Sequence, residues 1–191
     1  MGADLMKFDA RQVVLFVVSE LGDRRNGKTF IQKACFFVGR LTGHRLGFGP
    51  HFYGPYSDDV SGELAYLVGG DLLVETRQGS GAVGETGWEV AHLDYCLTDK
   101  GRDGLGFLET KHPTESALVR SAIRQVLSAG SLDYLELSLA AKAVWIEEPH
   151  GKSLDPGNIA SAATRFGWTV SARQVERATE FLKKLNLAEV R

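Results

Sequence analysis

The sequence predicts a mainly α-helical protein with a small β wing, and residues 52–101 carry most of that prediction. In this stretch a short helix is followed by a strand-like run at 72–77, a glycine-rich segment and a second strand-like run at 88–97. A further helix then begins, and this order is that of a winged helix. We therefore predict a winged-helix unit at 9–110 and a helical extension at 113–191 that ends in a helix-turn-helix-like unit. The sequence leaves open whether these two parts share one core.

Two helices are expected before that stretch. Asp9 can cap the first, whose apolar stripe runs to Leu21 and stops near Gly22. The second begins at Lys28 and carries an apolar face of its own. After it, the segment 46–56 holds three glycines, two prolines and four aromatic residues, which excludes a regular helix. We expect this segment to run extended, with its rings anchored on the core.

Caps and glycines define the rest of the winged unit. Ser57 can cap a helix that has Asp58 and Asp59 in its first turn, where the helix dipole favours carboxylates. The segment 78–87 contains four glycines, so we expect a mobile hairpin tip between the two strands. Thr98 can cap the helix that follows the second strand.

The helical extension shows a similar alternation of caps and apolar stripes. Pro113 opens one helix, and a very apolar helix after Ser131 is expected to be buried on several sides. Residues 147–156 form the clearest linker in the chain. Ser171 and Gln174, three residues apart, form a capping box for the last helix.

Composition and charge predict a reduced, cytoplasmic protein. Apolar residues make up 43% of the chain, an ordinary value for a soluble globular protein, and the longest apolar run near the N-terminus is too short to span a bilayer. Cys35 lies in an apolar helical pattern and Cys96 in a strand pattern, so two reduced, buried thiols are expected rather than a disulfide. The net charge of −2 is unevenly spread, with +4 over 1–56, −8 over 57–141 and +2 over 142–191. The acidic middle favours a protein partner over DNA.

The helix at 58–68 would be the DNA-reading helix of a winged-helix unit. It carries three carboxylates and neither Lys nor Arg, and carboxylates repel the phosphate backbone of DNA. We therefore expect a protein partner at this face. The candidate partner-binding residues are Tyr53, Tyr56, Asp58 and Asp59. The alternative is that the rings of this segment only pin the loop to the core.

The last helix is the better candidate for contact with nucleic acid. Arginine and glutamine can make bidentate contacts to base edges, and lysine can contact phosphates. The candidate nucleic-acid-binding residues are Arg173, Gln174, Arg177 and Lys183. Glu176 and Glu180 alternate with them, which a solvated, salt-bridged helix face explains equally well.

No pattern typical of catalysis or of cofactor binding is present. The five histidines lack the spacing of a metal site, and the pair Gly47 and Gly49 lacks the third glycine of a dinucleotide-binding loop. We expect no catalytic residue, no metal, no cofactor and therefore no enzyme. A small-ligand sensor or an enzyme built on the segment 51–56 stays open as a third hypothesis.

Two motifs carry a resemblance to a known family. They are Lys28-Thr-Phe-Ile-Gln-Lys-Ala-Cys-Phe-Phe37 and Phe52-Tyr-Gly-Pro-Tyr-Ser57. With the acidic helix and the strand after them, they resemble the YwgA-like bacterial proteins and, more distantly, the Panacea domain of SocA-like antitoxins. The similarity covers residues 12–76, with a fainter match at Ala140-Ala-Lys142. The resemblance implies a small cytoplasmic protein without catalysis, in which Panacea domains neutralise toxins by protein contact.

The sequence thus predicts a non-catalytic binding protein of the antitoxin kind. Its expected partner is another protein, which would be a toxin if the chain acts as an antitoxin. The alternative is a winged-helix transcriptional regulator that binds DNA, for which a homodimer is expected. Neither hypothesis involves a membrane.

Overall fold

The computed structural model describes residues 7–22, 27–51, 54–83, 89–130, 134–147, 164 and 170–187, and these are mainly α-helical with two small antiparallel strand pairs. This confirms the predicted fold class. The helices are α1 (Ala10–Leu21), α2 (Lys28–Thr42), α3 (Asp58–Gly69), α4 (Asp99–Lys111), α5 (Pro113–Ala129), α6 (Tyr134–Glu147) and α8 (Ala172–Lys184). The strands are β1 (Phe48–Gly49), β2 (Tyr56–Ser57), β3 (Leu73–Val83) and β4 (Glu89–Leu97).

Side-chain caps set the starts of four helices, as the sequence predicts. The Asp9 carboxylate accepts from the first turn of α1, and the Ser57 hydroxyl accepts from the Val60 N–H of α3 at 3.0 Å. The Thr98 hydroxyl accepts from the Gly101 N–H of α4 at 3.0 Å. Ser171 and Gln174 form the expected capping box at the start of α8. Each cap satisfies N–H groups that the helix itself leaves without an acceptor.

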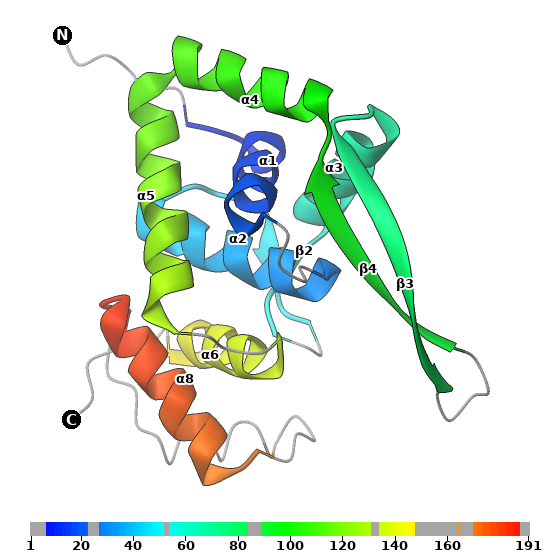
Figure 1. The fold of residues 1–191 in the computed structure, drawn as a ribbon. Coiled ribbons are helices and arrows are strands. Elements are labelled where there is room, and N and C mark those ends of the chain that lie inside the picture. Colours follow the sequence, from blue (N-terminus) through cyan, green and yellow to red (C-terminus); the bar gives the residue numbers. More distant parts are fainter. Residues whose placement is uncertain are drawn as a thin grey trace, which may run out of the picture.

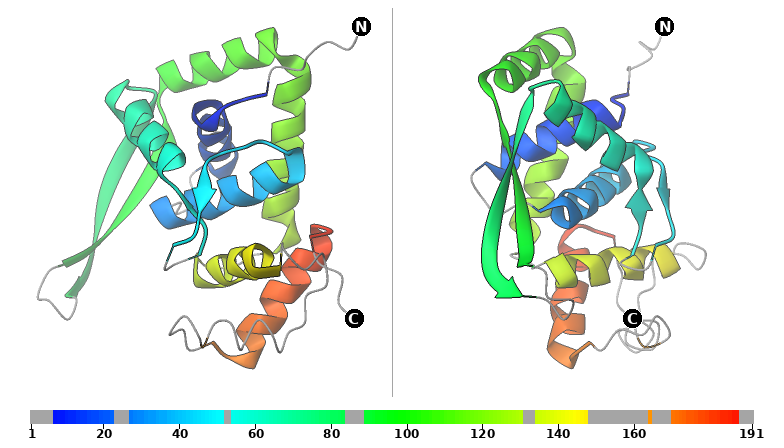
Figure 2. Two further views of the ribbon diagram at one scale, coloured as in Figure 1. Left: turned by 180° about the vertical axis from the view of Figure 1, so that it is seen from behind. Right: turned by 90° about the vertical axis from the view of Figure 1, so that its right-hand side faces the viewer.

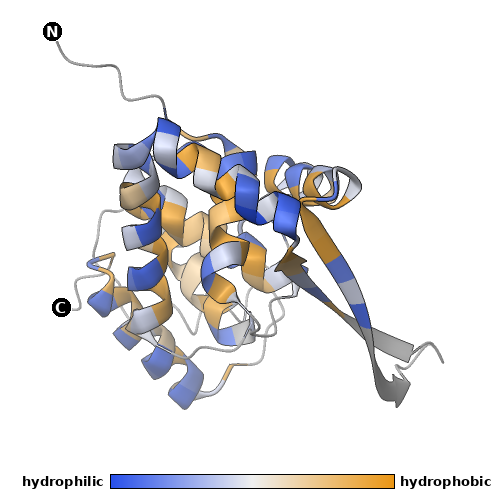
Figure 3. Cartoon of the chain, turned by 45° about the horizontal axis from the view of Figure 1, so that its top comes forward, coloured by the Kyte–Doolittle hydropathy of each residue, from blue (hydrophilic) through white to orange (hydrophobic). Residues whose placement is uncertain are grey.

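The helices α1 and α2 lie at the centre of the molecule (Figure 1). The long helix α5 runs along one side of both, α4 crosses one end, and α6 and α8 close the opposite end (Figures 1 and 2). The apolar residues of α1 and α2 face these neighbours, while the outer faces of α5 and α8 are mostly hydrophilic (Figure 3).

A single cluster of buried apolar side chains connects the two predicted parts of the chain. It includes Phe16 of α1, Phe37 of α2, Ile123 of α5, Ala140 of α6 and Phe181 of α8. The described residues on either side of position 112 therefore share one core. The apolar helix α6 is buried on several sides, as expected, because it packs against both α2 and α8.

The wing is longer than the sequence suggests. The β3–β4 ladder pairs Leu73 with Leu97 and continues to Gly79 opposite Ala91, and after a register shift Val83 pairs with Glu89. The prediction of a loop over the whole of 78–87 is wrong for 78–83, because ladder hydrogen bonds use backbone groups and tolerate glycine. The two strands extend beyond the helical body (Figures 1 and 2). Three helices followed by this hairpin are compatible with a winged helix.

The start of α4 is bonded to the base of the wing. The Thr98 N–H donates to the Leu72 carbonyl at 3.1 Å, and its hydroxyl donates to the Asp71 carbonyl at 2.7 Å. Lys100 donates to the Gly70 carbonyl at 2.8 Å. On the other side, Arg120 of α5 bridges Glu20 of α1 and Glu109 of α4. These contacts hold α4 against both the wing and the core.

Two further expectations concern thiols and membranes. Cys35 and Cys96 are both free, as predicted. Cys35 is fully buried, as expected. The expected burial of Cys96 is wrong, because this residue lies on the two-stranded wing and is only half-buried. Among the described residues, none of the helices is both long enough and apolar enough to cross a membrane.

Candidate functional site

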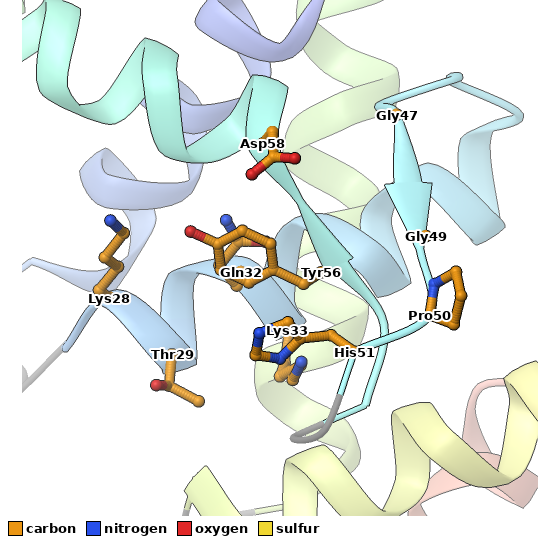
Figure 4. A pocket seen from close by; sticks show the side chains of 10 residues that line it. All are labelled: Lys28, Thr29, Gln32, Lys33, Gly47, Gly49, Pro50, His51, Tyr56 and Asp58. Atoms are coloured by element: carbon orange, nitrogen blue, oxygen red, sulfur yellow. The ribbon is translucent and has the colours of Figure 1, made fainter.

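A cleft of about 540 Å³ lies between α2 and the β1–β2 segment, and we name it the α2–hairpin cleft (Figure 4). It is lined by Lys28, Thr29, Gln32, Lys33, Gly47, Gly49, Pro50, His51, Tyr56 and Asp58. One wall is the N-terminal half of α2, and the other is the pair of short strands with the first residue of α3 (Figure 4). The cleft therefore lies where the two motifs of the sequence meet.

Gln32 fixes the position of the opposite wall. Its amide donates to the Ser57 carbonyl at 2.8 Å and accepts from the Ser57 N–H at 3.0 Å, and the residue is only 2% exposed. The Ser57 hydroxyl in turn donates to the Leu46 carbonyl at 2.5 Å. The side chain of Gln32 thus bonds to Ser57 as the backbone of a neighbouring strand would. It satisfies the buried N–H and carbonyl of Ser57, which would be costly to leave without partners.

Lys33 is a buried cation beside the cleft. Its ammonium donates to the Pro55 carbonyl at 2.6 Å, and the residue is 1% exposed. Burial, with the charge of Lys142 as a second cause, lowers the pKa of Lys33 from 10.5 to about 8. Burial likewise lowers the pKa of Lys142 on α6 to about 8.

Gly54 lies beside both lysines, and its backbone conformation favours glycine. Its φ is +85°, and a Cβ would lie 3.2 Å from the Ser138 carbonyl oxygen and 3.7 Å from the Lys33 ammonium nitrogen. The glycine of the Tyr53-Gly-Pro-Tyr56 motif is therefore explained by its positive φ and by the close approach of α6 to this segment.

The burial of Lys33 predicts an unusual pH dependence of stability. Between about pH 8 and pH 10.5 the unfolded chain holds more protons on this amine than the folded chain does, so raising the pH stabilises the fold. Relative to Lys33→Met, the wild type should gain about 2 kcal/mol of unfolding free energy from about pH 8 to about pH 10, measured by urea denaturation. Lys28→Met changes an exposed lysine of the same helix and is the matched control. Because this variant keeps Lys33, its stability difference from the wild type should not change over this pH range. A stability difference between the wild type and Lys33→Met that stays the same from about pH 8 to about pH 10 would contradict the lowered pKa of Lys33.

The rim of the cleft combines rings with charges of both signs. The rings of His51 and Tyr56 pack together with centroids 5.0 Å apart at 31°. Lys28 and Thr29 are the first residues of α2, so the partial positive charge of the helix N-terminus adds to Lys28. Asp58, exposed on α3, supplies a carboxylate at the other side. The described part of the chain holds no cluster of histidine, cysteine or acidic residues suited to a metal ion.

The predicted partner-binding residues lie around this cleft, as far as they are described. Tyr56 and Asp58 line it, and Asp59 is exposed in the first turn of α3 beside Gly47. Tyr53 lies outside the described residues.

The exposed face of α3 continues away from the cleft with Ala65 and Tyr66. Tyr66 is 57% exposed, and the guanidinium of Arg11 lies 4.1 Å from its ring centroid. Arg11 also pairs with Glu63 at 2.6 Å, so this cation comes from α1 and is already engaged.

The predicted nucleic-acid-binding residues have divided roles. Arg173 and Lys183 are exposed on α8. Gln174 belongs to the capping box, and Arg177 pairs with the buried Glu136 carboxylate of α6 at 2.7 Å. Arg177 therefore stabilises the α6–α8 contact, because removing it would leave a buried charge without its cation.

Sequence reasoning missed the roles of Gln32, Lys33 and Lys142. Gln32 and Lys33 lie in the motif 28–37 and Lys142 in the fainter match at 140–142, but a single sequence gives no sign that these segments meet at 54–57. The signal that could have found them is that Gln and Lys on the apolar face of a helix need buried partners.

No family model matches the chain, and no curated protein matches its sequence.

Proposed function

We propose that this protein is a non-catalytic, cytoplasmic binding protein whose partner is another protein, with the exposed face of α3 as the contact surface. The observation that supports this most is the position and charge of α3. It follows the β1–β2 segment and precedes the wing, it exposes Asp58, Asp59 and Tyr66, and its sequence contains neither Lys nor Arg. The partner would present a basic surface to it.

The physical case is one of complementarity. Exposed carboxylates at the N-terminus of α3 repel the phosphates of DNA but attract basic side chains, and such charges mainly set association rates and exclude wrong partners. An exposed tyrosine beside them supplies apolar area with a hydroxyl, a combination enriched at the energetic centres of interfaces. The more distant resemblance of 28–37 and 52–57 to the Panacea domain of SocA-like antitoxins favours a toxin as the partner.

A DNA-binding regulator is the second candidate. The observations that favour it are the β3–β4 hairpin, which extends beyond the helical body, and the exposed Arg173 and Lys183 on α8. In this case the wing and α8 would touch DNA, and the chain would be expected to act as a dimer.

Affinity capture of the tagged chain from its own lysate, with and without nuclease, tests the proposal. We expect a stoichiometric protein that survives nuclease treatment and is reduced about tenfold by Asp58→Lys or by Asp59→Lys, because each change reverses a charge at the interface. Asp103→Lys, at an exposed position of α4, changes the net charge equally and should leave capture intact. Circular dichroism should show that all variants are folded.

Different outcomes would overturn the proposal. Loss of the captured protein after nuclease, or equal capture by all three variants, would count against a partner at α3. Captured DNA that is lost in Arg173→Ala/Lys183→Ala would favour the regulator instead. Capture of one tagged copy by another, at unit ratio and without a further protein, would identify a homodimer as the complex.

A further inference from the structure

We propose that the α2–hairpin cleft binds a small organic anion, one bearing a phosphate or carboxylate group, with the Lys33 ammonium as its central cation. This goes beyond the proposed function, which concerns the exposed face of α3. The cleft measures about 540 Å³. Sites for small molecules typically span roughly 300–1,000 Å³ and combine apolar walls with a few convergent polar groups.

Two cationic groups line the cleft on the same helix. Among the described residues, the Lys33 ammonium donates one hydrogen bond, to the Pro55 carbonyl, and an ammonium has three donors. Lys28 lies at the start of α2, where Gly27 has no side chain to accept from the first N–H groups. The N-terminal charge of the helix therefore acts in the same direction as both lysines.

The buried position of Lys33 supports a ligand of negative charge. Removing an ammonium from water is unfavourable, and Lys142 nearby adds repulsion that a well-packed apolar residue at position 33 would avoid. Gly54, which leaves room for the two lysines, is itself under a conformational constraint that only glycine meets easily. An anion in the cleft would offset the repulsion between the two amines.

The opposite wall constrains the rest of the ligand. His51 and Tyr56 form a ring surface at the cleft that suits a planar or apolar body (Figure 4). Thr29 adds a hydroxyl near Lys28. The Asp58 carboxylate can accept from a donor on the ligand and repels a second anionic group. We therefore expect one anionic end and an uncharged aromatic or apolar remainder.

Calorimetric titration of the full chain with phenyl phosphate, benzoate and benzyl alcohol tests the inference. Phenyl phosphate or benzoate should bind, and whichever binds more tightly identifies the preferred anionic group. Benzyl alcohol, which has the ring but no charge, should bind at least tenfold more weakly. Lys33→Met should weaken binding of the anion about tenfold or more, and Lys28→Met about two- to threefold, because its charge is exposed. Lys183→Met, on the distant α8, is the matched control and should not change binding.

A stability measurement on Lys33→Met shows whether lost binding results from lost folding. The variant should unfold at the same urea concentration as the wild type or at a higher one, since it removes a buried charge. If Lys33→Met should not fold, Lys28→Met and benzyl alcohol still decide the question. Anion binding unaltered by the lysine variants, equal binding of benzyl alcohol, or no binding of any probe at millimolar concentration would each overturn the inference. Loss of anion binding in Lys33→Met with intact partner capture would separate this site from the α3 surface.

Discussion

Replacing Phe181 by alanine should lower the free energy of unfolding by about 3–5 kcal/mol, the range measured for large aromatic side chains removed from cores. Phe181 lies on α8 and is 2% exposed. Its ring packs edge-on against Phe37 of α2, with centroids 5.1 Å apart at 74°. Alanine would leave a cavity between the last described helix and the central one. Urea denaturation followed by circular dichroism measures the change.

The same experiment tests whether the two predicted parts fold as one unit. Because α2 and α8 share a cluster of buried side chains, the variant should unfold in one transition that is shifted as a whole. Leu118→Ala, at a position of α5 that is 44% exposed, is the control and should change stability by less than about 0.5 kcal/mol. Two separate transitions, with only the second weakened in Phe181→Ala, would show that the C-terminal part has a core of its own.

Most of the fold could be predicted because its signals are local. A cap residue acts on N–H groups two or three positions away, so Asp9, Ser57, Thr98 and Ser171 mark helix starts in the sequence itself. The shared core could not be derived in this way. Whether Phe181 packs on Phe37 depends on how α1, α2, α5, α6 and α8 assemble. A periodic apolar stripe predicts that a helix face is buried, but it does not indicate which element packs against that face.

The candidate site was predictable only in part, for the same reason. Tyr56 and Asp58 stand out in the sequence because Tyr56 follows Pro55, and Asp58 follows the cap residue Ser57 at the start of a helix without Lys or Arg. Gln32 and Lys33 lie on the helix face that faces the interior, where an apolar pattern would place hydrophobic residues. Their partners are backbone carbonyls of residues 55 and 57, and any residue type has a carbonyl, so no side-chain pattern reveals the pairing.

Gly101→Ala should be strongly destabilising, by about 3 kcal/mol, although alanine is usually the better helix former. Gly101 lies in the first turn of α4 against the base of the wing. A Cβ at this position would lie 2.1 Å from the Leu72 carbonyl oxygen and 2.9 Å from a methyl carbon of Leu97. The Leu72 carbonyl is also the acceptor for the Thr98 N–H, so Leu72 cannot move away without losing that bond.

The matched control is Gly106→Ala, five residues further along the same helix. Apart from its own helix backbone, no described part of the chain lies within 4 Å of where the alanine methyl group would be, so this change should stabilise the protein by about 0.5–1 kcal/mol through the lower entropy of the unfolded chain. Helix propensity alone would make both substitutions stabilising. Opposite signs of the stability change in urea denaturation would therefore support the close contact of α4 with Leu72 and Leu97 at the base of the wing. Equal stability of the two variants would mean that the start of α4 does not rest on the wing, and the attachment of the hairpin to the helical body would have to be explained by other contacts.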